Sequence, residues 1–244
     1  NNNILTNNTV SSYIDTAYGI HLQSSNTNNL TSNNITTSGS SSYGIYFDTS
    51  SKNTLTSNTI TTTSTSTAYG IYFYNSNETN VYNTKINTTA AGTSNDIYVY
   101  GANLYRNYII NSTFNKSDVG FDASATDRIE VQWYLDVYVN NTLGNPVNQA
   151  NVTAWNVTGN KTFSELTAST GYITTKTLTE YMQNRTNKYY QTNYTVNATK
   201  SGYGGDTKQV NLTQSRSIYL TLQSYTSVEI SLNLTAGVLF TNRT

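Results

Sequence analysis

Apolar residues recur through the first half of the chain in short alternating pairs, set among Asn, Ser and Thr. Each repeat reads Asn-x-Leu-x-x-Asn-x-Ile, then a variable polar stretch, then Tyr-Gly-Ile-x-Phe. A period of about 25 residues is typical of a solenoid. A helical repeat needs apolar residues at i, i+3, i+4 and i+7, and a leucine-rich repeat needs more leucine. Alternation at every second residue is strand spacing, so the pattern predicts a parallel β-helix with a rise of ~4.8 Å per rung.

Three columns of apolar side chains are expected to stack inside this helix. The first column is Leu5, Leu30, Leu55, Val81 and Leu104. The second is Val10, Ile35, Ile60, Ile86 and Ile109, and the third is Ile20, Ile45, Ile71, Ile97 and Val119. Two asparagine ladders are expected at the corners, namely Asn3, Asn28, Asn53 and Asn8, Asn33, Asn58, Asn107. Asparagine tolerates left-handed backbone, and stacked amides hydrogen-bond from rung to rung.

The repeat resembles the NosD-like family of right-handed β-helix proteins, within the wider pectate-lyase-like group. The motif recurs nearly verbatim from Asn3, Asn28 and Asn53, and weaker copies extend it to Phe121. The resemblance implies the fold of residues 1–127. It implies no particular activity, because this fold carries lyases, hydrolases, epimerases, adhesins and inert scaffolds.

A different pattern begins at Ile129, after a short polar joint. Long alternating strands are separated by turns at Gly144-Asn-Pro146 and at Gly159 and Gly171, which indicates a small β-sandwich. Residues Val137–Leu222 resemble the carboxypeptidase-regulatory-like, or transthyretin-like, sandwiches of secreted surface proteins. The expected fold is therefore all-β, with a right-handed parallel β-helix over 1–127, an Ig- or transthyretin-like β-sandwich over 128–224, and a tail over 225–244.

The tail carries a further strand pattern after an apparently complete sandwich. Its apolar positions are Val228, Ile230, Leu232, Leu234, Val238, Leu239 and Phe240. One interpretation is the last strand of the sandwich, or the start of another domain. The other is an intersubunit strand that pairs with the next copy of the chain.

Composition narrows the classes of function. The chain has 244 residues, a formal net charge of zero, 11% charged residues and no cysteine. Sparse, balanced charge argues against nucleic-acid binding, and the absence of cysteine excludes disulfides and thiolate metal sites. No transmembrane run is visible, so we expect no membrane insertion. Since Asn1 to Val10 already lie within a repeat, we expect a processed chain or a segment of a longer one.

The acidic residues suggest no catalytic centre. Sugar-cleaving β-helix enzymes gather two or three carboxylates on one face. The acids of the first half occupy different phases of the repeat and are not expected to stack; they are Asp15, Asp48, Glu78, Asp96, Asp118, Asp122 and Asp127. His21 is the only histidine, and no nucleophile motif or phosphate loop is present. We therefore expect no enzyme activity, no catalytic residue, no metal site and no cofactor.

One column of residues is expected on the outer face of the closing strands. It consists of His21, Tyr46, Tyr72 and Tyr98. Alternation points these side chains away from the core. Such a ladder would stack on sugars or contact another protein. The alternative is packing beneath the chain's own second domain or a loop.

The acceptor triplet for N-glycosylation, Asn-x-Ser/Thr, is abundant. It begins at Asn7, Asn29, Asn34, Asn77, Asn87, Asn111, Asn115, Asn140, Asn151, Asn156, Asn160, Asn184, Asn193, Asn197, Asn211, Asn233 and Asn242. Only 7 of the 22 asparagines in residues 1–129 begin a triplet, near chance for so polar a sequence, against 10 of 14 thereafter. Strand alternation explains part of this excess, because it places Asn and Thr together on a wet face. We expect dense N-glycosylation, concentrated in the second half.

These observations lead to a structural function. We expect an N-glycosylated extracellular or cell-surface protein, archaeal by its resemblances, that polymerises into a filament, sheath or surface layer. The alternatives are an adhesin that binds glycans through the Tyr ladder and, from a different class, a polysaccharide lyase or hydrolase. The expected partners are further copies of the chain and covalent N-glycans.

Overall fold

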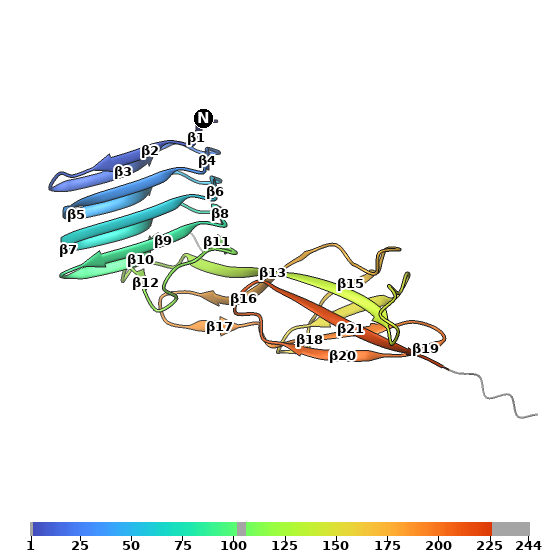
Figure 1. Ribbon diagram of the computed structural model, residues 1–244. Helices are drawn as coiled ribbons and strands as arrows, with labels where there is room; N and C mark the ends of the chain where they lie inside the picture. Colours follow the sequence, from blue (N-terminus) through green and yellow to red (C-terminus); the bar gives the residue numbers. More distant parts are fainter. Residues whose placement is uncertain (1, 102–105, 226–244) are drawn as a thin grey trace, which may run out of the picture.

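The computed structural model describes residues 2–101 and 106–225, and all regular structure in that part of the chain is β-strand. Residues 1, 102–105 and 226–244 lie outside the described chain, together with the expected intersubunit strand, Leu104, Asn233 and Asn242. Figure 1 shows stacked rungs joined to a second group of strands. Within the described residues, no helix has the length and apolar character needed to span a membrane.

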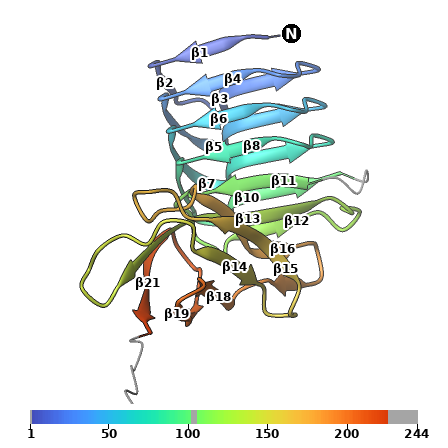
Figure 2. The ribbon, with the colours of Figure 1, turned by 90° about the vertical axis from the view of Figure 1, so that its right-hand side faces the viewer.

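The first part of the chain is a β-solenoid with parallel strands. One wall takes a short strand from each rung: β1 (Ile4–Thr6), β4 (Asn29–Thr31), β6 (Thr54–Thr56), β8 (Asn80–Tyr82) and β11 (Arg106–Ile110). The other wall is formed by β2 (Thr9–Ser12), β3 (Thr16–Gln23), β5 (Asn34–Asp48), β7 (Thr59–Tyr74), β9 (Lys85–Ala90), β10 (Thr93–Tyr100) and β12 (Val119–Phe121). Figure 2 shows the rungs stacked above one another, with the second group of strands below them. The expected parallel β-helix is confirmed.

The predicted apolar columns hold through the fourth repeat. Leu30 pairs in register with Leu55, Ile35 with Ile60, and Ile45 with Ile71, and these side chains are fully buried. The third column also continues to its end, where Ile97 pairs with Val119. Identical apolar groups thus pack on one another from rung to rung, which is how a thin solenoid obtains a core.

The register predicted for the fifth repeat is wrong. Ile109 pairs with Val81 and Val131, so it belongs to the leucine column and not to the isoleucine column. Asn107 likewise belongs to the first asparagine ladder, because its Oδ1 accepts from the backbone amide of Thr79 at 3.1 Å. The cause is the longer connection after Tyr100, which delays the motif relative to the earlier copies.

Hydrogen bonds along the asparagine ladders connect each rung to the next. Asn28 Nδ2 donates to Asn53 Oδ1 at 2.8 Å, and Asn33 Nδ2 donates to Asn58 Oδ1 at 3.0 Å. The left-handed backbone lies one residue earlier, for example at Ser32 with φ 55°. The ladder asparagines are therefore used for their amides, and the neighbouring corner residue makes the turn.

A single strand links the solenoid to the second group of strands. The first half of β13 (Arg128–Asn141) pairs in parallel with β11 as the next rung, and its second half pairs with β21 (Arg216–Ser224). The opposite edge of β13 pairs with β16 (Lys176–Gln183), which pairs with β17 (Lys188–Tyr190), while β19 (Tyr203–Gly204) pairs with β21. One sheet therefore runs from the solenoid into the second part.

A separate four-stranded antiparallel sheet completes the second part. Its order is β15 (Lys161–Leu166), β14 (Asn151–Trp155), β18 (Tyr194–Thr199) and β20 (Asp206–Val210). The hydroxyl of Tyr194 in this sheet donates to the carbonyl of Thr179 in β16 at 2.7 Å. Buried apolar residues of the solenoid and of both sheets form one continuous core.

Candidate functional site: an aromatic face on the solenoid

The aromatic face originates in the closing strand of each repeat. The glycine after the first tyrosine lies against the strand of the next rung, β7, in the same wall: a Cβ on Gly44 would lie 2.3 Å from Ile60 Cγ2 and 2.5 Å from the carbonyl of Gly70. Gly44 and Ile45 are both buried, so the alternation of inward and outward residues shifts by one position at this glycine. Tyr43 and Tyr46, three positions apart, therefore both point outward, and Ile45 between them is buried.

The predicted column forms a continuous stack. His21 and Tyr46 have ring centroids 4.8 Å apart, and Tyr46 and Tyr72 have theirs 4.9 Å apart at an angle of 18°. Tyr72 and Tyr98 meet nearly edge to face at 5.4 Å. Tyr46, Tyr72 and Tyr98 are partly exposed and His21 is exposed.

A second column, which the sequence reasoning missed, lies beside the first. Tyr18 stacks on Tyr43 with a centroid distance of 5.2 Å, and Tyr43 meets Tyr69 at 5.6 Å and 52°. Tyr69 also stacks on Tyr98 of the first column at 4.3 Å and 6°. The signal was present in the sequence as the first tyrosine of Tyr-Gly-Ile, which recurs in three repeats as Tyr18, Tyr43 and Tyr69. Strict alternation counted back from the inward Ile45 would turn Tyr43 inward, but Gly44 and Ile45 are both buried and Tyr43 therefore faces outward. A third pair, Tyr74 and Tyr100, extends the face.

The face is neutral and rich in hydroxyl groups. Burial, and then the negative charge of Asp48, raises the pKa of Tyr46 to about 12. Burial, and then the neighbouring Tyr98, raises the pKa of Tyr69 to about 12. Asp48 accepts a hydrogen bond of 3.2 Å from Gln23, which adds a polar margin. Since offset stacking covers part of each ring face with the next ring, solvent meets mainly ring edges and hydroxyls.

Two acids of the solenoid lie closer than expected. Asp96 and Asp118 occupy the same position on adjacent rungs, because Ile97 pairs with Val119 and the amide of Asp96 donates to the carbonyl of Asp118 at 2.9 Å. The expectation that no acids stack is wrong for this pair. Burial, and then the charge of Asp96, raises the pKa of Asp118.

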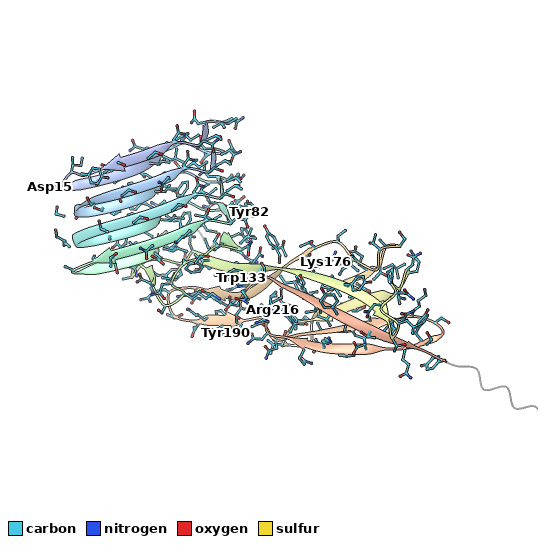
Figure 3. The ribbon with its side chains drawn as sticks, viewed as in Figure 1. Asp15, Tyr82, Trp133, Lys176, Tyr190 and Arg216 are labelled. Carbon is cyan, nitrogen blue, oxygen red and sulfur yellow. The ribbon has the colours of Figure 1, made fainter. Side chains whose placement is uncertain are left out.

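Both acids have structural partners. The carboxylate of Asp96 is buried and accepts from the Thr88 hydroxyl and from the amide of Asn115. Asp118 accepts from Asn95 Nδ2 at 3.3 Å. Asp15 lies at the far edge of the solenoid, away from Trp133 at the junction with the second part (Figure 3). The hydrogen bonds of Asp96 and Asp118 indicate that this pair stabilises the corner of the solenoid.

The structure sorts the acceptor triplets by accessibility. Exposed asparagines are Asn7, Asn29, Asn34, Asn87, Asn115, Asn151, Asn160, Asn193 and Asn211. Partly exposed ones are Asn111, Asn140, Asn184 and Asn197. Asn77 and Asn156 are buried, with 7% and 9% of their surface accessible.

The fold defines a class, the parallel β-solenoid proteins. Comparison with family models narrows the class: residues 1–173 match the family described as Periplasmic copper-binding protein (NosD). This match covers most of the chain, which therefore belongs to the NosD family. No curated protein matches the chain.

The donor set of this chain does not fit a copper site. Copper sites in proteins use Cys, Met and His ligands. The chain has no Cys, one His and one Met. His21 lies among aromatic rings with its Nε2 3.9 Å from the Asp48 carboxylate, and no group of three His, Cys, Asp or Glu suited to a metal occurs among the described residues.

Proposed function

We propose that this chain is a structural, N-glycosylated protein of an extracellular surface and a subunit of a filament, sheath or surface layer. We place it on an archaeal cell surface, without enzymatic activity, nucleic-acid partners or membrane insertion. The family's description as periplasmic supports a site outside the cytoplasm. We further propose that the second part is a small β-sandwich of the carboxypeptidase-regulatory-like kind, and the apolar core shared by two sheets there supports a sandwich.

The observation that carries this proposal is the strand β13. It is at once a rung of the solenoid and a strand of the second part, so the two parts are connected by backbone hydrogen bonds instead of a linker. A body of this kind suits a load-bearing subunit. Its abundant Ser, Thr and Asn side chains keep the surface hydrated, and the exposed triplets accept glycans.

Assembly would proceed by strand addition. The apolar positions Val228, Ile230, Leu232 and Leu234 alternate along the tail, and an exported strand of this kind adds to a sheet edge of the next copy. Contacts between different surfaces of the same subunit produce filaments when they do not close into a ring.

Electron microscopy of native extracellular material, with intact-mass analysis of the same sample, tests the proposal. We expect regular fibres or sheets and a mass well above the 27.0 kDa of the bare chain. Ile230→Lys should abolish assembly, whereas Glu229→Lys, on the opposite face of the strand pattern, should preserve it. Dispersed particles at the bare mass would refute both assembly and glycosylation.

The aromatic face supports a second candidate, a glycan-binding adhesin. Its tyrosines are partly exposed and neutral, and they present hydroxyls that suit the hydroxyls of a sugar chain. Replacing Tyr46, Tyr72 and Tyr98 by Ser should abolish binding in a glycan array without unfolding the chain. The matched control is Tyr189→Ser with Tyr190→Ser, two exposed tyrosines away from the face. Unchanged binding by the triple variant would reject the adhesin function.

A further inference from the structure

Three acceptor triplets adopt the same local turn. In each, the asparagine Oδ1 accepts hydrogen bonds from the backbone amide and the hydroxyl of the residue two positions later. The hydroxyl distances are 2.7 Å from Ser117 to Asn115, 3.2 Å from Thr186 to Asn184 and 2.8 Å from Thr158 to Asn156. The amide distances are 3.1, 3.0 and 3.2 Å in the same order.

The turn prepares the asparagine for N-glycosylation. The donors on Oδ1, two at Asn115 and three at Asn156 and Asn184, polarise the side-chain carbonyl, which makes the Nδ2 protons more acidic. In the transfer, Nδ2 forms a bond to the anomeric carbon of a sugar, and the bond from that carbon to the phosphate of a glycosyl-phosphate donor breaks. The phosphate leaves with the electron pair, and the Nδ2 proton passes to a base of the transferase.

Only two of the three asparagines leave Nδ2 available. Asn115 is exposed and Asn184 partly exposed, and neither Nδ2 donates a hydrogen bond within the described residues. Asn156 is buried, and its Nδ2 donates to Gln191 Oε1 at 2.7 Å. Asn156 therefore has the same turn, but its Nδ2, the atom that would be glycosylated, is already hydrogen-bonded in a buried residue.

The two open turns lie close together at the junction. Lys188, which follows the Asn184 turn, donates from Nζ to the backbone carbonyl of Lys116, next to Asn115, at 2.7 Å. The Asn184 turn joins β16 and β17, which Figure 1 shows beneath the last rung beside β12. Glycans on both turns would cover this side of the joint between solenoid and second part.

We propose that Asn115 and Asn184 are the principal glycan acceptors of the described chain and that Asn156 stays unmodified. This selection rests on the proposed N-glycosylation and adds that modification acts on the folded chain. It further places the most highly occupied acceptors at the joint, while the other exposed triplets of the second half are occupied less often.

Glycopeptide mass spectrometry of the full chain from native material tests this selection. We expect glycans on the peptides that carry Asn115 and Asn184 and an unmodified Asn156. Asn115→Gln and Asn184→Gln should each lower the intact mass by one glycan, while the matched control Asn156→Gln leaves it unchanged. Thermal melting verifies that the three variants fold.

Three results would overturn the proposal. Equal occupancy at Asn156 and Asn115 would show that transfer precedes folding. Bare Asn115 and Asn184 beside glycans on other triplets would show that the turn does not select. A chain without any glycan would refute the proposed glycosylation itself, which distinguishes that failure from the other two.

Discussion

The indole Nε1 of Trp133 donates a hydrogen bond of 2.6 Å to the carboxylate of Glu180, across the paired strands β13 and β16. The ammonium of Lys116, from the turn after the last short rung strand, reaches the same oxygen at 2.5 Å and lies 4.7 Å from the centroid of the Trp133 ring. One buried carboxylate therefore ties a solenoid turn to the second part of the chain.

Removing this carboxylate should weaken the joint. Glu180→Ala leaves the buried indole N–H of Trp133 without an acceptor and removes the ionic partner of the partly exposed Lys116, whose Nζ keeps the carbonyl of Thr213 at 2.8 Å. We expect a loss of about 2–3 kcal/mol in the free energy of unfolding. Urea denaturation measures it. The control is Glu78→Ala, whose pair with Lys52 spans 3.9 Å in solvent and should contribute less than about 1 kcal/mol. Equal losses would contradict a buried joint.

A methyl group at Gly44, where the chain lies in close contact with the next strand, should destabilise the solenoid. Gly44→Ala forces a Cβ to within 2.3 Å of Ile60 Cγ2, and we expect a loss of about 3 kcal/mol or more in the free energy of unfolding. Gly159→Ala is the matched control: no atom lies within 4 Å of its Cβ, so only its φ of +81° opposes the change. Equal melting temperatures for the two variants would contradict the prediction that the close contact at Gly44 excludes a side chain.

Alkaline pH should destabilise the aromatic face. The pKa values of Tyr46 and Tyr69 are about 12 in the folded chain, against about 10 for an unfolded tyrosine. The folded chain holds these protons more tightly, so their stabilisation is complete below about pH 10 and is lost as the pH rises through about 12. Denaturation curves across this window measure the loss. The double variant Tyr46→Phe with Tyr69→Phe should reduce this loss of stability between about pH 10 and pH 12, whereas Tyr189→Phe should leave it unchanged.

The inner asparagine ladder should be intolerant of truncation. Asn33 donates from Nδ2 to Asn58 Oδ1 at 3.0 Å and to the carbonyl of Leu5 at 2.9 Å, and its Oδ1 accepts the amide of Asn8 at 3.0 Å. Asn33→Ala removes these three bonds, although Asn58 Oδ1 keeps the backbone amide of residue 33 at 2.9 Å and Asn8 is exposed. We therefore expect a loss of about 1–3 kcal/mol on thermal or urea unfolding. The exposed Thr59→Ala should change stability by less than about 0.5 kcal/mol. If Asn33→Ala left the free energy of unfolding unchanged, water would be able to replace the hydrogen bonds of the ladder.

The repeat predicts the solenoid because stacking demands identical residues at identical heights. Leu30 and Leu55, or Ile45 and Ile71, could be paired from the sequence because successive copies have nearly equal lengths. The prediction was wrong for the fifth copy because that copy is not of equal length. Once the connection after Tyr100 lengthened, counting from one motif to the next assigned Ile109 to the wrong column.

Two other features were beyond reach of the pattern. The second tyrosine column depends on a break in the inward–outward alternation at Gly44, which lies in close contact with the neighbouring strand β7. The shared role of β13 was hidden because alternation has the same period in a rung and in an ordinary sheet. Ile129 and Val131 therefore look alike whether their strand pairs with β11 or with another partner.

The continuous β13 also has a mechanical consequence. Tension applied along this strand passes from the last rung to β21 through one unbroken backbone, and the ladders on both its edges resist sliding together. Many hydrogen bonds must then break at once, instead of opening one after another as in a peeled hairpin. In the proposed polymer, a row of such chains would stretch little before it ruptures, because β13 offers no slack where a flexible linker would otherwise stand.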